Sequence, residues 1–253
     1  MIVPVKAKKI DPDQFVSDIV ADDYRTAGVF RKYGIDFLAK EKSLKGVCTT
    51  KGLDIGTVSD ELQARTRAIQ LPNALDFEGW DVDFLTEYIV HVHHEYLRTA
   101  LPEAKDYLVT FIEEQGKEFP YLFDLIHIYN ELLDETFPHL QQEEVIIFPY
   151  IRQIAHALGN KEPYAGLLVR TLRKPVENVM HHEHAVVNKL LHEMRRLTHS
   201  YLLPEDACLC HRIAYLKLRE IDEDLIQHLY LENDVLFPRA IAMEKELLER
   251  RDE

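Results

Sequence analysis

The chain has 253 residues, 46% of them hydrophobic, and a formal net charge of −14 at pH 7. This charge argues against partners with a nucleic-acid backbone or an anionic membrane surface. Three cysteines are too few for a disulfide framework, and no apolar run is long enough to span a membrane. The start, Met1-Ile-Val-Pro-Val-Lys6, has no signal-peptide pattern, so we expect a protein of the reducing cytoplasm.

The first part of the chain predicts short helices separated by turn residues. Ser43 suits the N-cap of a helix that ends near Gly52, and Gly34 suits the left-handed position after a helix. The expected helices cover residues 13–20, 24–33, 43–52 and 57–69. The segment 71–79 then breaks the helical period. We therefore predict a small helical N-terminal domain over residues 1–72 and a second domain over residues 80–253.

The second domain predicts four long helices with short connections. They are expected over residues 83–115, 121–158, 163–199 and 204–250. Nine glycines and few β-branched alternations indicate an all-α protein, and four long helices with short joins favour an antiparallel up-down four-helix bundle. Prolines inside helical stretches should kink them. These are Pro102, Pro149, Pro175 and Pro238.

One pattern occurs twice in this domain. The segment from His139 to Pro149 and the segment from His228 to Pro238 both place a His four residues before a Glu and end in Phe-Pro, at an offset of 89 residues. A further histidine precedes each copy, His94 by 45 residues and His184 by 44. The domain is thus predicted to be a duplicated helical hairpin.

The periodicity of each helix tests whether these residues face the core. Bundle seams advance by alternating steps of three and four residues. The predicted seams run through Val90, His94, Leu97, Leu101, Ala104 and Leu108; through Leu125, Ile128, Leu132, Thr136, His139, Glu143, Ile146 and Tyr150; through Val176, Met180, His184, Val187, Leu191 and Met194; and through Leu218, Ile221, Leu225, His228, Glu232 and Val235. The first helix has a second apolar stripe, so its inward face is ambiguous. That stripe is Leu85, Ile89, Val92 and Tyr96.

Six polar residues therefore interrupt apolar seams. They are His94, His139, Glu143, His184, His228 and Glu232. Two buried carboxylates are costly unless cations neutralise them. Four imidazoles and two bridging carboxylates can hold two metal ions and leave coordination positions open. The ligand set suits iron, with manganese and zinc as alternatives. A single His-x-x-x-Glu is usually a solvated surface pair; the matched repetition on seam positions favours the metal site.

Other polar residues near these positions are expected to have lesser roles. We expect His91, His93, His181 and His182 to face solvent or to lie just outside the ligand set. Glu183, beside His184, is expected to be a surface carboxylate, with a place along an entry path as the alternative.

These residues resemble a known family. His94-Glu-Tyr-Leu-Arg98, His139-x-x-x-Glu143 with Ile-Phe-Pro, Glu183-His184, and His228-x-x-x-Glu232-Asn with Leu-Phe-Pro-Arg resemble hemerythrin-like domains. More narrowly, the chain is similar to the bacterial "repair of iron centres" (RIC) di-iron proteins, and residues 13–69 resemble their N-terminal domain. The resemblance implies a hemerythrin-like bundle in which all six residues bind an oxo- or hydroxo-bridged pair of irons, with Glu143 and Glu232 bridging.

The same resemblance implies a function in protecting or repairing iron–sulfur clusters under nitrosative or oxidative stress. The chemistry would be iron donation, or reduction of nitric oxide or peroxide by a di-iron oxidoreductase, and iron–sulfur proteins would be partners. One departure stands out. Family members usually carry Cys-Cys-Gly-Gly where this chain has Leu38-Ala39-Lys40-Glu41.

Two other functions remain open from the residues. One is a hemerythrin-like protein that binds or senses oxygen or nitric oxide without turnover. The other is a structural bundle that holds zinc. The small N-terminal domain could pair two chains as a homodimer.

Overall fold

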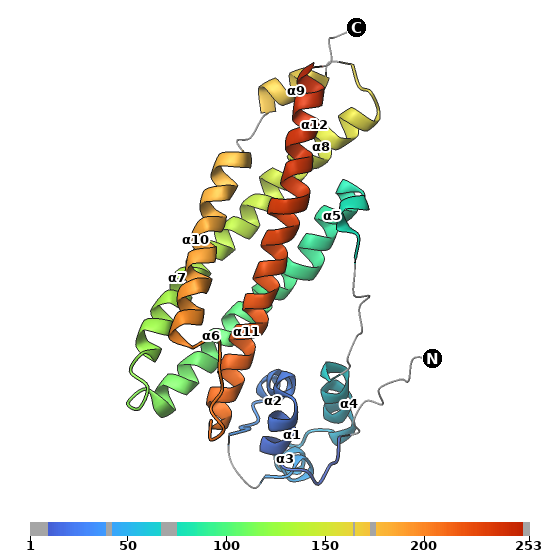
Figure 1. Ribbon diagram of the computed structural model, residues 1–253. Coiled ribbons are helices and arrows are strands. Elements are labelled where there is room, and N and C mark those ends of the chain that lie inside the picture. Colours follow the sequence, from blue (N-terminus) through green and yellow to red (C-terminus); the bar gives the residue numbers. More distant parts are fainter. Residues whose placement is uncertain (1–9, 39–41, 67–74, 164, 173–175, 250–253) are drawn as a thin grey trace. The chain divides into compact units, whose positions relative to one another are not determined.

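The computed structural model describes residues 10–38, 42–66, 75–163, 165–172 and 176–249 (Figure 1). It also describes the side chains in these ranges, except those of residues 168, 172 and 176–182. The chain forms two compact units, one from residues 1–74 with 203–216, the other from residues 75–202 with 217–253. Each unit is described by itself below. Within the described residues, no helix is long and apolar enough to cross a membrane.

The first unit is built from short helices whose ends are set by local capping. Its elements are α1 (Val16–Asp22), the 3-10 turn Tyr24–Thr26, α2 (Ala27–Lys32), α3 (Leu44–Lys51) and α4 (Ile55–Arg65). As predicted, Ser43 caps α3, with its Oγ accepting the Gly46 N–H, and the helix ends at Gly52. Gly52 has a φ of 66°. The start of α4 differs from the prediction: Asp54 caps it by accepting the Thr57 N–H at 2.7 Å. The predicted residues 67–69 of this helix lie outside the described part of the chain.

The second unit is an antiparallel four-helix bundle, as predicted (Figure 1). The chain runs along the bundle in alternating directions through four helical rods. The first rod is α5 (Val82–Tyr88), a π-helical turn (Ile89–His94) and α6 (Glu95–Gln115). The second is α7 (Leu122–Gln142), a π-helical turn (Glu143–Ile147) and α8 (Phe148–Gly159), and the third is α9 (Ala165–Leu172) and α10 (Val176–Leu197). The fourth is α11 (Leu209–Tyr230), which belongs to this unit from residue 217 onward, a π-helical turn (Leu231–Leu236) and α12 (Phe237–Glu249). A 3-10 turn, Phe77–Gly79, precedes the first rod.

Most of the predicted seams form the core of this bundle. Leu97, Leu101, Leu132, Leu191 and Leu218 are fully buried, and the six predicted site residues are buried among them. The side chains of the predicted seam residues Val176 and Met180 lie outside the described part of the structure. Pro175, where a kink is predicted, lies outside the described backbone as well. The six site residues therefore form a polar layer within a largely apolar core.

The π-helical turns were not predicted, and they explain where the seams shift. A π turn adds a residue to a helical turn and rotates the inward face of the helix that comes after it. In the first rod, Leu85 and Ile89 are therefore buried before the turn and Leu97 after it, so parts of both apolar stripes face inward. In the second rod the predicted seam residue Ile146 is wrong: it is 41% exposed, and Ile147 is buried in its place.

Two of the prolines predicted to kink the helices lie directly after these turns. Pro149 and Pro238 are the second residues of α8 and α12. A proline donates no N–H, and its ring clashes with the carbonyl four residues earlier. A widened turn just before the proline accommodates both effects. Each π turn also carries a predicted site residue: His94, Glu143 or Glu232.

Candidate metal centre

The structure brings all six predicted site residues together in the middle of the bundle. None is more than 5% exposed. Their ligand atoms form two groups of four, and within each group these atoms lie within 4.8 Å of one another. The first group is His94, Glu143, His228 and Glu232; the second is His139, Glu143, His184 and Glu232. Both carboxylates therefore belong to both groups, the arrangement expected of bridging ligands.

In each group two imidazoles face each other through their Nε2 atoms. The Nε2 atoms of His94 and His228 are 3.1 Å apart, and those of His139 and His184 are 3.0 Å apart. The carboxylates lie beside them. Glu143 Oε1 is 3.1 Å from His139 Nε2, and Glu232 Oε1 is 2.9 Å from His228 Nε2. Each of these His–Glu contacts joins residues one helical turn apart, which is what the four-residue spacing dictates.

Three of the histidines are oriented from outside the cluster through Nδ1. His94 Nδ1 contacts Glu144 Oε1 at 2.8 Å, and His139 Nδ1 contacts Glu183 Oε2 at 2.7 Å. His184 Nδ1 contacts Asn233 Oδ1 at 2.8 Å. A carboxylate or amide oxygen can only accept, so Nδ1 carries the proton in each ring. In a neutral ring the Nε2 atom that points inward then holds a lone pair.

The repeated Phe-Pro tails also have a place in this geometry. The Phe148 ring stacks on His94, with centroids 5.7 Å apart, and the Phe237 ring stacks on His184 at 5.9 Å. Each phenylalanine therefore holds the ring of the lone histidine from the neighbouring helix of its own hairpin. The tails were part of the repeated sequence pattern, but only the packing shows what they contact.

Two features of the site show whether metal ions would fit it: the spacing of the facing imidazole nitrogens, and the buried carboxylate oxygens that receive no hydrogen bond. Two nitrogens about 2.1 Å from a common first-row dication, at right angles, are about 3.0 Å apart, as both imidazole pairs are here. Two facing lone pairs at that separation repel each other unless a proton or a metal cation lies between them. The four carboxylate oxygens of Glu143 and Glu232 are buried and receive no hydrogen bond of normal geometry. The residues present therefore fit a pair of bound cations.

The ionisation of the cluster is divided unevenly. Burial lowers the pKa of His94 to about 4 and that of His228 to about 3. Burial disfavours a charged His139 as well, but the Glu143 carboxylate raises its pKa to about 10. Burial, and then repulsion from Glu143, raises the pKa of Glu232 well above its usual range, whereas His139 keeps that of Glu143 well below it despite burial. Without metal ions, protons on the histidines and carboxylates of the cluster balance its buried negative charge. Bound cations would take over that role.

The residues around the ligand set differ in part from the expectation. Glu183, expected at the surface, orients His139, and Glu144 and Asn233 were not predicted to act on the site. Of the nearby histidines, His91 is exposed between Glu87 and Glu95, whereas His93 is buried. The side chains of His181 and His182 lie outside the described part. Each orienting residue is next to a ligand in the sequence, and that adjacency is the signal that could have identified them.

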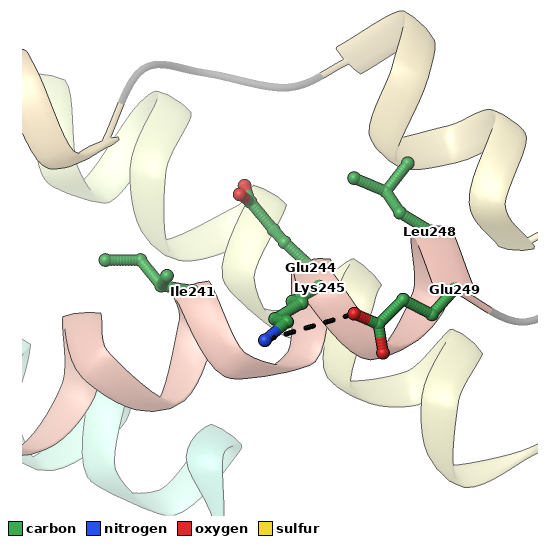
Figure 2. A pocket seen from close by; sticks show the side chains of 5 residues that line it. All are labelled: Ile241, Glu244, Lys245, Leu248 and Glu249. Carbon is green, nitrogen blue, oxygen red and sulfur yellow. Dashed lines mark ion pairs between the residues drawn. The ribbon is translucent and has the colours of Figure 1, made fainter.

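A surface pocket elsewhere in the bundle is separate from this centre. It has a volume of about 360 Å³ and is lined by α12 residues alone (Figure 2). The lining residues are Ile241, Glu244, Lys245, Leu248 and Glu249. Glu244 follows Glu232 by twelve residues, about 18 Å along a helix. The pocket therefore contributes no wall to the His/Glu cluster.

An antiparallel four-helix bundle with a buried His/Glu cluster of this composition defines a hemerythrin-like cation-binding protein. The family model for the hemerythrin HHE cation-binding domain matches residues 86–240. A second model, ScdA_N, described as a domain of unknown function, matches residues 12–66.

The combination of these two domains identifies the family. The chain is 31% identical to the iron–sulfur cluster repair protein YtfE of Cronobacter sakazakii over 92% of this chain and 98% of that protein. It is 28% identical to the iron–sulfur cluster repair protein ScdA of Staphylococcus haemolyticus over 90% of this chain and 98% of that protein. The YtfE protein of Escherichia coli O1:K1 is 28% identical over 92% of this chain and 98% of that protein. The chain belongs to the ScdA/YtfE family of iron–sulfur cluster repair proteins.

Proposed function

We propose that the six buried side chains hold two iron ions. His94 and His228 would bind one ion, His139 and His184 the other, and Glu143 and Glu232 would bridge them. The observation that carries this proposal is the convergence of four Nε2 atoms and two buried carboxylates into two groups of four, within each of which the ligand atoms lie within 4.8 Å of one another. Mixed nitrogen and oxygen ligands suit iron among the first-row metals, with manganese and zinc as alternatives.

A bound di-iron pair would supply redox chemistry and open positions for a small molecule such as nitric oxide, oxygen or peroxide. The protein's own contribution is to orient the ligand side chains and to keep bulk water away from the site. The outer oxygens of Glu144, Glu183 and Asn233 fix three rings in the tautomer that presents Nε2 inward. The apolar layers around the cluster keep bulk water away, which strengthens each electrostatic contact inside.

We further propose that this centre protects or repairs iron–sulfur clusters under nitrosative or oxidative stress. The relatives that match over nearly their whole length are named iron–sulfur cluster repair proteins. Iron donation to a damaged cluster, or removal of nitric oxide or peroxide, would both serve it, and iron–sulfur proteins would then be the partners. The proposed setting is the cytoplasm, where such proteins are damaged.

A second function is favoured by the N-terminal sequence. Leu38 and Ala39 stand where the family's thiol pair usually lies, so a thiol-based relay of iron cannot occur there. A protein that binds or senses oxygen or nitric oxide without turnover needs only the bundle.

One experiment separates these functions. The purified protein is loaded with Fe(II), its iron content and visible spectrum are measured in air and after addition of nitric oxide, and it is then added to an enzyme whose [4Fe–4S] cluster has been damaged by nitric oxide. We expect about two irons per chain and recovery of the damaged enzyme. Reversible ligand binding without recovery would support the sensor. A protein that binds zinc in preference and shows no visible absorption would overturn both.

A further inference from the structure

One buried histidine beside the cluster is not explained by the six ligands. His93 is 1% exposed and lies in the first π-helical turn, next to His94. Its Nδ1 contacts Asp224 Oδ1 on α11 at 3.0 Å. Asp224 precedes His228 by four residues, so both lie on one face of the same helix. The pair therefore joins the first rod to the helix that carries a candidate ligand.

Two ring nitrogens at this place are buried without a hydrogen-bond partner. They are Nε2 of His93 and Nδ1 of His228. The two rings are neighbours, with centroids 6.0 Å apart and planes inclined by 33°. Buried polar atoms are normally satisfied, so two adjacent unsatisfied ones call for an explanation.

The hydrogen-bonding roles of the two atoms are complementary. The Asp224 carboxylate only accepts, so His93 Nδ1 carries the proton, and Nε2 of the neutral ring is an acceptor. His228 presents Nε2 to the cluster, 2.9 Å from Glu232. A ring that uses its Nε2 lone pair for a cation must carry its proton on Nδ1, which is then a donor. His93 Nε2 therefore lacks a donor, and the neighbouring His228 Nδ1 lacks an acceptor.

The duplication of the bundle supports the same pairing. His94 corresponds to His184 at an offset of 90, so His93 corresponds to Glu183. Glu183 accepts from His139, and His139 corresponds to His228. His93 thus occupies, in one half of the bundle, the position from which Glu183 orients a candidate ligand in the other half.

We propose that His93 and Asp224 are positioning residues for His228. In the metal-loaded protein, His228 Nδ1–H donates to His93 Nε2, and His93 Nδ1–H donates to Asp224. At the first ion position, His228 would then be oriented by His93 and, through it, by Asp224. At the second position, Glu183 orients His139 directly. This inference rests on the proposed metal centre and adds the residues that make its two positions unequal.

The test uses the full chain loaded with Zn(II), which is diamagnetic and allows nitrogen NMR of labelled histidines. In the wild type we expect a His228 Nδ1 proton that is shifted downfield and protected from exchange. His93→Phe removes the acceptor and should abolish that protection. His93→Gln offers an amide oxygen and should restore it in part, which a purely structural role would not do.

Metal affinity gives the second readout. Loss of an outer hydrogen-bond partner typically weakens metal binding about 10- to 100-fold. We expect one of the two Zn(II) ions to be released to a chelator about that much more readily in His93→Phe, and less so in Asp224→Asn. The matched control is His91→Gln, two residues away and exposed, which should keep both ions at wild-type affinity.

The outcomes separate this inference from the metal centre itself. If His93→Phe and Asp224→Asn fold as the wild type does and keep both ions and the protected proton unchanged, the positioning role is overturned while the centre stands. If the wild type binds no pair of ions, the centre itself fails. Circular dichroism and thermal melting of each variant show which have folded, and Asp224→Asn decides the matter if His93→Phe does not fold.

Discussion

The two halves of the bundle have the same candidate ligands but different surroundings. Each hairpin contributes a lone histidine and a His–Glu pair, and each stacks a phenylalanine on the lone ring. Outside the ligands the halves diverge. Glu144 contacts the lone histidine of the first half, and Asn233 does so in the second. The two halves therefore share the residues that could bind a cation. They differ in the groups that contact those residues, which are a carboxylate in the first half and a neutral amide in the second.

The largest effect should come from the residues that the two halves share. Glu143 belongs to both ligand groups, so Glu143→Leu should lose both irons, because no oxygen would remain at its bridging place. Iron per chain measures this. Glu144→Gln is the matched control, one residue away, and should retain two irons because its amide oxygen can still accept from His94. Retention of about two irons in Glu143→Leu would refute the assignment.

Protonation should oppose metal binding unequally in the two halves. The Glu143 carboxylate raises the pKa of His139 to about 10, so this ring holds a proton at neutral pH that a metal ion must displace. Burial and repulsion from Glu143 raise the pKa of Glu232 as well. Binding should therefore release protons, and apparent affinity should fall at least about tenfold for each unit of decreasing pH. Calorimetry of Zn(II) binding in buffers of different ionisation enthalpy counts the protons. An affinity independent of pH between 6 and about 8 would contradict this.

A third difference between the halves concerns stability. Asp222 is buried and receives hydrogen bonds from Arg195 of α10, whereas the matching position of the first half, 89 residues earlier, is Leu133. Arg195→Leu should leave the buried Asp222 without its cationic partner, and should lower the free energy of unfolding by about 2 kcal/mol. Urea denaturation measures it. The double variant Arg195→Leu/Asp222→Leu removes both charges and places at position 222 the residue found in the first half, so it should recover most of the loss. No recovery would mean that the pair has another role.

The smallest expected effect makes the two halves more alike. Asn233→Asp places a carboxylate opposite His184, as Glu144 is opposite His94. A charged acceptor raises the basicity of the ring, so the iron held by His139 and His184 should bind a few-fold more tightly and be harder to reduce. Redox titration followed in the visible spectrum measures this. Asn233→Gln keeps a neutral amide and serves as control; equal potentials in both variants would show that this contact does not tune the site.

The sequence by itself determined the helical class, the duplicated hairpins and the position of the six polar residues. These follow from local rules: the 3.6-residue period, caps such as Ser43, and a His and a Glu one turn apart. The comparisons confirm the fold class and the family, and the role of the six as ligands stays a prediction. The N-cap at Asp54 was not predicted because Asp54 and Thr57 are both suitable N-cap residues, and the predicted helix began at Thr57.

Only the tertiary structure decided how the four rods meet. The π turns shift the inward face by one residue, which exposes Ile146 and buries Ile147, and nothing in a regular helical period marks such an insertion. The partners of the ligands are equally non-local: Glu183 contacts His139 across 44 residues, and Asp224 contacts His93 across 131. Spacing along one helix fixes which side chains share a face, but a contact between helices depends on how the helices pack together.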